Sequence, residues 1–189
     1  AEIVQIYHDT LKKLTHLKKE FSSIDINPII SIGDTPSCSV VNDFTGVDEI
    51  RPGNFVFYDM MQYKLGSCTL KDIAVVLACP VVAKHSERNE IVIYGGAIHL
   101  SKEYLTDEQG NRNFGWIVKL KPNEWSEPVS DSYVKALSQE HGIIRTTNEF
   151  ISELKIGDIV GILPVHSCLA ANQMKEYLTT ENKRIIKMY

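Results

Sequence analysis

The sequence lacks any apolar run near the roughly 18 residues that a membrane-spanning helix requires, so we expect no membrane partner. It also lacks a Cys-x-x-Cys pair. Its four cysteines, Cys38, Cys68, Cys79 and Cys168, do not have the spacing of a small disulfide-stapled scaffold. We therefore expect free thiols and a cytoplasmic protein, because disulfides are rare in reducing compartments.

An excess of positive charge is also missing. The chain carries 20 Lys and Arg against 24 Asp and Glu, a formal net charge of −4. Surfaces that bind nucleic acid are strongly basic, so no nucleic acid partner is expected. The one cationic run, "LKKLTHLKKEF", also carries acids and has a helical pattern, which favours a solvated helix face.

What the chain does have is an ordinary globular composition, with 43% hydrophobic and 23% charged residues over 189 positions. In residues 1–22, apolar side chains recur every three or four positions, which predicts an amphipathic helix. Ile29, Ile30 and Ile32 then form a short continuous apolar run that ends at Gly33. Such a run is typical of a parallel strand covered on both faces.

From residue 47 onward the pattern changes to short β-rich segments separated by Gly, Pro and Asn turns. This pattern predicts a mostly antiparallel β-sandwich or barrel-like domain over 47–189. A second helix is expected within 168–182, and 131–142 is expected to form a short strand or helix and a turn. The β-rich segments are 55–59, 72–85, 89–101, 114–121, 157–165 and 183–189.

One helix and one doubly covered strand cannot form a parallel sheet by themselves. We therefore expect residues 1–46 to be the end of a longer α/β unit, and the start at Ala1 without a methionine agrees with a fragment. The predicted fold class is mainly β with an α/β remnant.

Two segments in the first third of the chain have residues suited to chemistry. "SIGDTPSCS" offers Gly33, Asp34 and Thr35 at a strand-to-loop turn, where backbone N–H groups and hydroxyls can hold a phosphate. An ordinary polar turn is the more common interpretation. "RPGNFVFYDMMQY" is interpreted as a strand that carries Tyr58, Asp59 and Gln62 at its end, either at a site or at a plain edge facing water.

Two further segments combine glycine with histidine. Gly95 and Gly96 interrupt a strand pattern, which indicates a bulge or a close backbone approach, and His99 alternates with apolar residues. Glu140 and His141 precede Gly142 and could take part in acid–base chemistry or lie in a surface turn. Nothing in the sequence around Lys102 indicates the apolar surroundings that Schiff-base chemistry would require.

The sharpest signal is "PVHSC". On a strand, residues two apart face the same side, so His166 and Cys168 would present an imidazole and a thiolate together, a pair suited to Zn²⁺. Two ligands would leave the metal open to water or substrate. A buried cysteine beside a hydrogen-bonded histidine explains the pair about equally well. A nucleophilic Cys168 activated by His166 is less favoured, because neighbours on one strand rarely have the required geometry.

Together these segments resemble one group of enzymes. "IGDTPSCS", "GVDEIRPGNFVFYD", "IYGGAIHLSKE", "ALSQEHG" and "LPVHSCLAANQ" occur in the same order as in the D-threonine aldolase and D-serine dehydratase group. These are pyridoxal 5′-phosphate enzymes of the alanine-racemase fold (fold-type III). The resemblance covers about residues 25–180 and implies the last helix and strand of a (β/α)₈ barrel over 1–46, followed by a C-terminal β domain over 47–189.

The resemblance also implies roles for individual residues. His166 and Cys168 match the pair that holds zinc in the dehydratases, whereas the aldolases tend to have His-x-Asp, so Cys168 favours a dehydratase. Gly33, Asp34 and Thr35 match a loop near the cofactor phosphate. Tyr58 and His141 are the implied catalytic candidates. The metal would activate the β-hydroxyl of a small D-amino acid substrate.

One departure is large. The Schiff-base lysine of these enzymes lies on the first barrel strand, and no lysine in this chain has a matching position. The resemblance therefore implies a C-terminal part of a homodimeric lyase that is inactive alone. The alternatives are a racemase of the same fold and a non-catalytic β module for dimerisation. A thiol hydrolase that uses Cys168 is the weakest.

Overall fold

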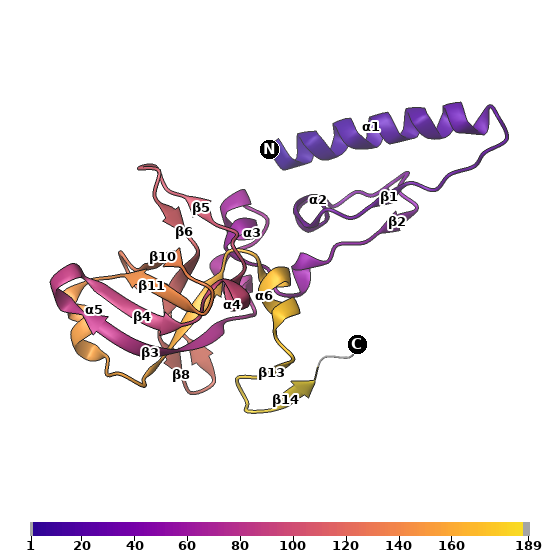
Figure 1. Cartoon of the computed structure of the whole chain (residues 1–189). Helices are drawn as coiled ribbons and strands as arrows, with labels where there is room; N and C mark the ends of the chain where they lie inside the picture. The colour runs from indigo at the N-terminus through magenta and orange to yellow at the C-terminus, as the bar shows by residue number, and fades with distance from the viewer. Residues whose placement is uncertain (1, 187–189) are drawn as a thin grey trace.

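The computed structural model describes residues 2–186. They form a small N-terminal layer, residues 2–50, and a β-barrel (Figure 1). The chain begins with α1, Glu2–Ser22, as the apolar spacing predicts. Tyr7 of α1 is buried against Ile30, Ile32 and Val41. This N-terminal cluster draws all of its buried residues from the first 41 positions.

The predicted strand near residue 30 forms, but it is short. β1, Ser31–Ile32, pairs in parallel with β2, Glu49–Ile50. α2, Thr35–Val40, connects the two strands. Ile30 and Ile32 are buried, whereas Ile29 is 66% exposed, so the covered part of the run begins only at Ile30. The division of the chain at residue 46 stays a prediction.

Residues 77–164 supply a closed barrel with strand order β10-β11-β4-β3-β12-β7. Every neighbouring pair of strands is antiparallel. The predicted fold class is therefore confirmed, because the protein is mainly β. Of the two predicted architectures, a sandwich and a barrel, the structure has the barrel. The barrel strands are β3 (Leu77–His85), β4 (Glu90–Tyr94), β7 (Gly115–Val118), β10 (Tyr133–Leu137), β11 (His141–Arg145) and β12 (Ile159–Pro164).

The barrel interior is filled by side chains that alternate along its strands. Ile91, Ile93, Ile117, Ile144 and Ile162 are each fully buried. Burial of one such side chain is worth about 1.5–3 kcal/mol relative to exposure. On β4 and β11, buried residues alternate with more exposed ones, so the period of two in the sequence fixes which face enters the core. β12 is instead buried at every position from Val160 to Pro164.

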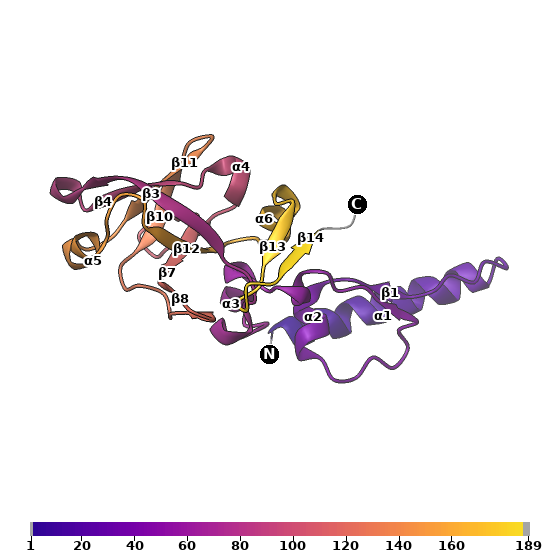
Figure 2. The same ribbon diagram turned by 90° about the horizontal axis from the view of Figure 1, so that it is seen from below.

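Shorter elements surround the barrel. They are η1 (Asn54–Val56), α3 (Met60–Leu65), η2 (Leu70–Asp72), η3 (Ser86–Arg88), α4 (Ala97–Leu100), β5 (Leu105–Thr106), β6 (Arg112–Asn113), β8 (Leu120–Lys121), β9 (Glu124–Trp125), α5 (Asn148–Glu153), α6 (Ser167–Gln173), β13 (Glu176–Leu178) and β14 (Arg184–Ile186). Figure 2 shows α6 and the β13–β14 hairpin between the barrel and the N-terminal layer.

Three predictions of local structure were wrong or incomplete. Residues 55–59 were predicted as strand but contain η1 and the cap of α3. The predicted helix in 168–182 ends at Gln173, and the chain then forms β13. The segment 89–101 was predicted as β-rich throughout, but β4 ends at Tyr94 and α4 follows. The strand alternative for 131–142 is confirmed, because β10 and the turn after it form a hairpin with β11. Residues 187–189 of the last predicted strand lie outside the described residues.

The Gly95–Gly96 pair follows β4, and the prediction of a close backbone approach is confirmed. A Cβ atom on Gly96 would lie 2.5 Å from the backbone of residues 139–141, and one on Gly95 would lie 2.5 Å from Cys79 Sγ. Only glycine leaves room for the β10–β11 turn to pack here.

Over residues 2–186, no helix is both long enough and apolar enough to cross a membrane.

Candidate active site

Tyr58 lies between η1 and α3 with an unusual backbone. Its φ is 49°, a left-handed conformation that is uncommon for a residue with a large side chain. Its phenol oxygen is 3.0 Å from Ser39 Oγ on α2, and Ser39 Oγ also donates to the carbonyl of Thr35. Tyr58 therefore reaches the same short helix that carries the candidate phosphate loop.

Asp59, the next residue, points into the protein and is fully buried. Its Oδ1 accepts a hydrogen bond from the backbone N–H of Gln62 at 2.9 Å, which caps α3. Its Oδ2 accepts from Asn54 Nδ2 at 2.5 Å and from the backbone N–H of Ser167 at 2.9 Å. One carboxylate thus joins three segments, and one of them is 108 positions away in sequence.

His166 and Cys168 do not lie on a strand, so the geometry predicted for them was wrong. β12 ends at Pro164, His166 is the N-cap of α6, and Cys168 is in its first turn. Both side chains are nonetheless half-buried, while Ser167 between them is fully buried. The imidazole and thiol are accessible on either side of a buried serine.

This donor set fits Zn²⁺, which takes imidazole nitrogen and thiolate sulfur as ligands. Within the described range 2–186, no group of three or more His, Cys, Asp or Glu side chains is arranged to hold a metal ion. The other coordination positions would have to come from substrate, water or residues outside this chain.

Gly33, Asp34 and Thr35 lie where β1 leads into α2. Asp34 is the N-cap of α2, and its carboxylate accepts from the backbone N–H of Ser37 at 2.8 Å. Thr35 is buried, whereas Gly33 and Asp34 are exposed. The guanidinium of Arg51 lies 3.5 Å from the position that a Cβ on Gly33 would occupy.

Arg51 was missed by the sequence reasoning, which treated its segment only as a turn and strand. It adds the positive charge that a phosphate beside Gly33 would need, although Glu49 lies 3.2 Å from its Nε. The basic residue directly before Pro52-Gly53 was the available signal.

His141 is the first residue of β11 and contacts the ring of Tyr94 edge to face, at 5.7 Å between centroids. Tyr94 also contacts His99, which lies on α4 and not on a strand as predicted. Burial lowers the pKa of His99, and the charge of Glu140 opposes this shift. His99 Nδ1 accepts from the N–H of Gly96, so the neutral ring carries its proton on Nε2.

The structure therefore brings the predicted residues together in part. Tyr58 contacts α2, and its neighbour Asp59 contacts the segment of His166 and Cys168. His141 reaches that segment only through Tyr94 and α4, which packs against α6 (Figure 1). Lys102 and Glu140 are exposed.

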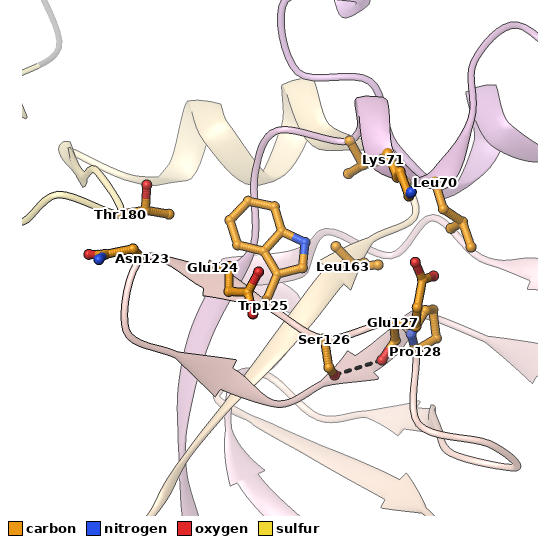
Figure 3. Close-up of a pocket in the computed structure, with 11 residues that line it drawn as sticks. Leu70, Lys71, Asn123, Glu124, Trp125, Ser126, Glu127, Pro128, Leu163 and Thr180 are labelled. Atoms are coloured by element: carbon orange, nitrogen blue, oxygen red, sulfur yellow. Dashed lines mark hydrogen bonds between the residues drawn. The ribbon is translucent and has the colours of Figure 1, made fainter.

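A pocket of about 400 Å³ lies elsewhere, between η2, β9 and the end of β12 (Figure 3). The indole of Trp125 stands among its lining side chains, which include Lys71 and Glu127 but no histidine or cysteine. Because none of the predicted site residues lines it, the donor chemistry and not this pocket defines the candidate active site.

Comparison with known proteins gives one family. The profile of the family described as "Putative serine dehydratase domain" matches residues 74–180, more than half of the chain. The D-serine dehydratase of Dictyostelium discoideum is 37% identical over 165 residues, which is 81% of this chain and 39% of that enzyme. The chain thus spans about two fifths of the length of the curated relatives that it matches.

Solved structures share the fold. An alanine-racemase-like protein from Idiomarina loihiensis aligns with 88% of this chain and 45% of its own, with 23% identity and a TM-score of 0.76. A metal-free cysteine-to-alanine variant of D-threo-3-hydroxyaspartate dehydratase aligns with 91% of this chain and 47% of its own, with 20% identity and a TM-score of 0.77.

Proposed function

The chain belongs to the serine dehydratase domain family, and from this premise we propose that it is the C-terminal part of a lyase that depends on pyridoxal 5′-phosphate and a divalent metal. Its substrates would be small D-3-hydroxy amino acids, with dehydration of D-serine favoured over retro-aldol cleavage of D-threonine. The observation that most directly supports this proposal is that His166 and Cys168 are accessible on either side of buried Ser167.

The residues present fit a metal. His166 and Cys168 supply one nitrogen and one sulfur donor, a set suited to Zn²⁺ with open coordination positions. A divalent cation held by these two residues would supply Lewis-acid activation of a substrate hydroxyl. The relative solved in a metal-free form carries a cysteine-to-alanine substitution, which supports a link between a thiol and metal in these enzymes.

Gly33, Thr35 and Arg51 also fit a phosphate group, whereas Asp34 is given a different role from the one predicted. Gly33 leaves space beside the Arg51 guanidinium, and Thr35 follows at the start of α2. Asp34 is an anion already engaged as a helix cap, so we assign it to orienting this loop and not to contacting phosphate. When bound, pyridoxal phosphate withdraws electrons from the substrate α-carbon. We place the lysine that holds it in another part of the whole protein.

Tyr58 and His141 are the proposed proton-transfer groups. The phenol of Tyr58 is held by Ser39 within reach of the α2 loop. The imidazole of His141 is half-buried and packed against Tyr94. The residue division 1–46 and 47–189 and a cytoplasmic location belong to the same proposal, and four free thiols support the location.

Products from D-threonine test the reaction type in the whole protein that contains this chain. Dehydration would release 2-oxobutanoate and ammonia, retro-aldol cleavage would release glycine and acetaldehyde, and inversion at the α-carbon would give only L-allo-threonine. We expect 2-oxobutanoate, and pyruvate from D-serine. Glycine and acetaldehyde as the main products would overturn the dehydratase assignment.

The metal is tested by elemental analysis of the same protein. We expect near-stoichiometric zinc in the wild type and zinc far below stoichiometry in His166→Ala and Cys168→Ser, because each variant loses one of the two donors. His16→Ala is the matched control, because His16 lies exposed on α1 with Glu20 as its partner. Equal zinc content in all four proteins would contradict the His166–Cys168 site.

A specific observation favours a second function, dimerisation. Ile6, Leu17 and Phe21 on α1 are 44–56% exposed. At 100° per residue they fall within about 60° on one face, beside the face that packs on the N-terminal cluster. We propose that a second copy of this protein covers this stripe. Light scattering should give a dimer mass for the wild type and a monomer mass for the Leu17→Lys, Phe21→Lys double variant. Equal masses would contradict this interface.

A further inference from the structure

The first turn of α3 holds both neighbours of His166. The backbone N–H of Met61 donates to the carbonyl of Val165 at 3.3 Å. On the other side, the backbone N–H of Ser167 donates to Asp59 Oδ2 at 2.9 Å. Because both flanking peptide groups are fixed, the backbone of His166 has little freedom to turn, and its side chain is directed by α3.

Asp59 does more than cap a helix. A cap requires one acceptor oxygen, which serine supplies about as well as aspartate. Here Oδ1 alone bonds the N–H of Gln62, while Oδ2 is committed to Asn54 and Ser167. The second oxygen therefore serves the long-range contact, and hydrogen bonds to a carboxylate are stronger than those between neutral groups.

The surroundings leave this contact without a substitute. The buried polar atoms that lack a hydrogen-bond partner within residues 2–186 are Asn54 Oδ1, Gln62 Oε1, Ser67 Oγ and Ser167 Oγ. Three of these four belong to the residues that donate to Asp59. Asp59 Oδ2 is the acceptor for the N–H of Ser167. Its loss would therefore leave a buried donor unpaired.

We infer that Asp59 is the positioning residue of the His166–Cys168 pair. Its Oδ2 fixes the Ser167 amide at the start of α6 and thereby sets the directions in which the imidazole and the thiol project. This inference rests on the proposed function, since the pair it positions is the proposed metal site. Asp59 itself is fully buried, and its shown partners are Asn54, Gln62 and Ser167.

Two substitutions separate positioning from capping. Asp59→Ser keeps one oxygen for the cap of α3 but removes Oδ2. Asp59→Asn keeps the shape and places an amide where the carboxylate accepts two hydrogen bonds. Thr147→Ala is the matched control, because Thr147 caps α5 at the far end of the barrel through the N–H of Phe150.

Hydrogen exchange of the segment 165–170, read by mass spectrometry on the metal-free protein, tests the anchor directly. We expect exchange of the Ser167 amide to be at least about tenfold faster in both Asp59 variants and unchanged in Thr147→Ala. Unchanged protection in Asp59→Ser would overturn the inference, whatever the metal does.

Titration with Co²⁺, followed by its thiolate absorption, tests the consequence for the pair. We expect Asp59→Ser to bind Co²⁺ about 10–100-fold more weakly with an altered spectrum, and Thr147→Ala to match the wild type. Fast exchange with an unaltered Co²⁺ spectrum and affinity would overturn the positioning role. A wild type that binds no Co²⁺ would instead contradict the proposed function, which the exchange measurement does not depend on.

Discussion

Replacement of Gly96 by alanine is expected to lower the free energy of unfolding by about 3 kcal/mol or more. The added Cβ would lie 2.5 Å from Gln139 O, the carbonyl carbon of Glu140 and His141 N, all of them backbone atoms. A backbone cannot rotate away as a flexible side chain can. Overpacking of this kind costs about 1–3 kcal/mol, to which broken hydrogen bonds add.

The hydrogen bonds at risk link residues 95–98 to the turn between β10 and β11. Gly95, Ala97 and Ile98 donate their N–H groups to the carbonyls of residues 138–140 at 2.9–3.1 Å. Each such bond contributes about 0.5–1.5 kcal/mol. Moving the turn would also shift His141, the first residue of β11, so activity should fall together with stability.

Urea unfolding measures this effect, with Gly53→Ala as the control. Gly53 has a φ of −108° and no atom within 4 Å of the added Cβ, so its substitution should change stability by less than about 0.5 kcal/mol. If Gly96→Ala were as stable as Gly53→Ala, the close approach of the two backbones would be disproved.

The second large effect is a loss of stability in alkali that depends on Cys79. Burial raises the pKa of this thiol from 9.0 to about 12, and the residue is 1% exposed. Below pH 9 the thiol keeps its proton in the folded and unfolded states alike. Between pH 9 and 12 only the unfolded chain releases the proton, so stability falls as pH rises. The full loss would reach about 4 kcal/mol near pH 12.

Cys68 acts in the same direction. Burial, then the charges of Asp72 and Asp59, raise its pKa to about 11. Urea midpoints measured from pH 8 to 10.5 should therefore decline, and the decline should be clearly less steep in Cys79→Ala, which lacks one of the two contributions. Parallel curves for the wild type and Cys79→Ala would show that burial of this thiol does not govern the alkaline limit.

The parts of the fold that follow from local pattern could be predicted from the sequence. The helix over 2–22 and strands such as β4 and β12 have a clear period or a continuous apolar run, and burial then fixes their faces. The strand β1 was predicted, but it is shorter than the apolar run. A continuous apolar run does not indicate which of its residues will be covered by neighbouring elements.

α2 and α3 were missed although the sequence carries their signals. Asp34 precedes a proline in the first turn of α2, and Asp59 is followed three positions later by Gln62, as in a capping box. Gly66, with a φ of 80°, then ends α3. The run "FVFY" before Asp59 has strong β propensity, and that local preference hid the cap.

The candidate site was predictable in composition but not in arrangement. The two-residue spacing of His166 and Cys168 identified a pair of possible metal donors. The two residues were predicted on one face of a strand, but they lie at the start of α6. The contact of Asp59 with Ser167 joins positions 108 residues apart, and no local pattern encodes it. Arg51 comes beside Gly33 only because β2 pairs with β1.

Closure of the barrel has a consequence for how the protein behaves at high concentration. Each of the six barrel strands has a partner on both sides, so the barrel presents no free edge on which another chain could add a strand. Within residues 2–186, four two-stranded sheets lie outside the barrel, namely β1–β2, β5–β6, β8–β9 and β13–β14. Exposed apolar side chains adjoin β1–β2 at Ile29 and Ile50 and lie on β13–β14 at Leu178, Ile185 and Ile186. Self-association through strand addition would therefore begin at one of these two-stranded sheets and not at the barrel strands.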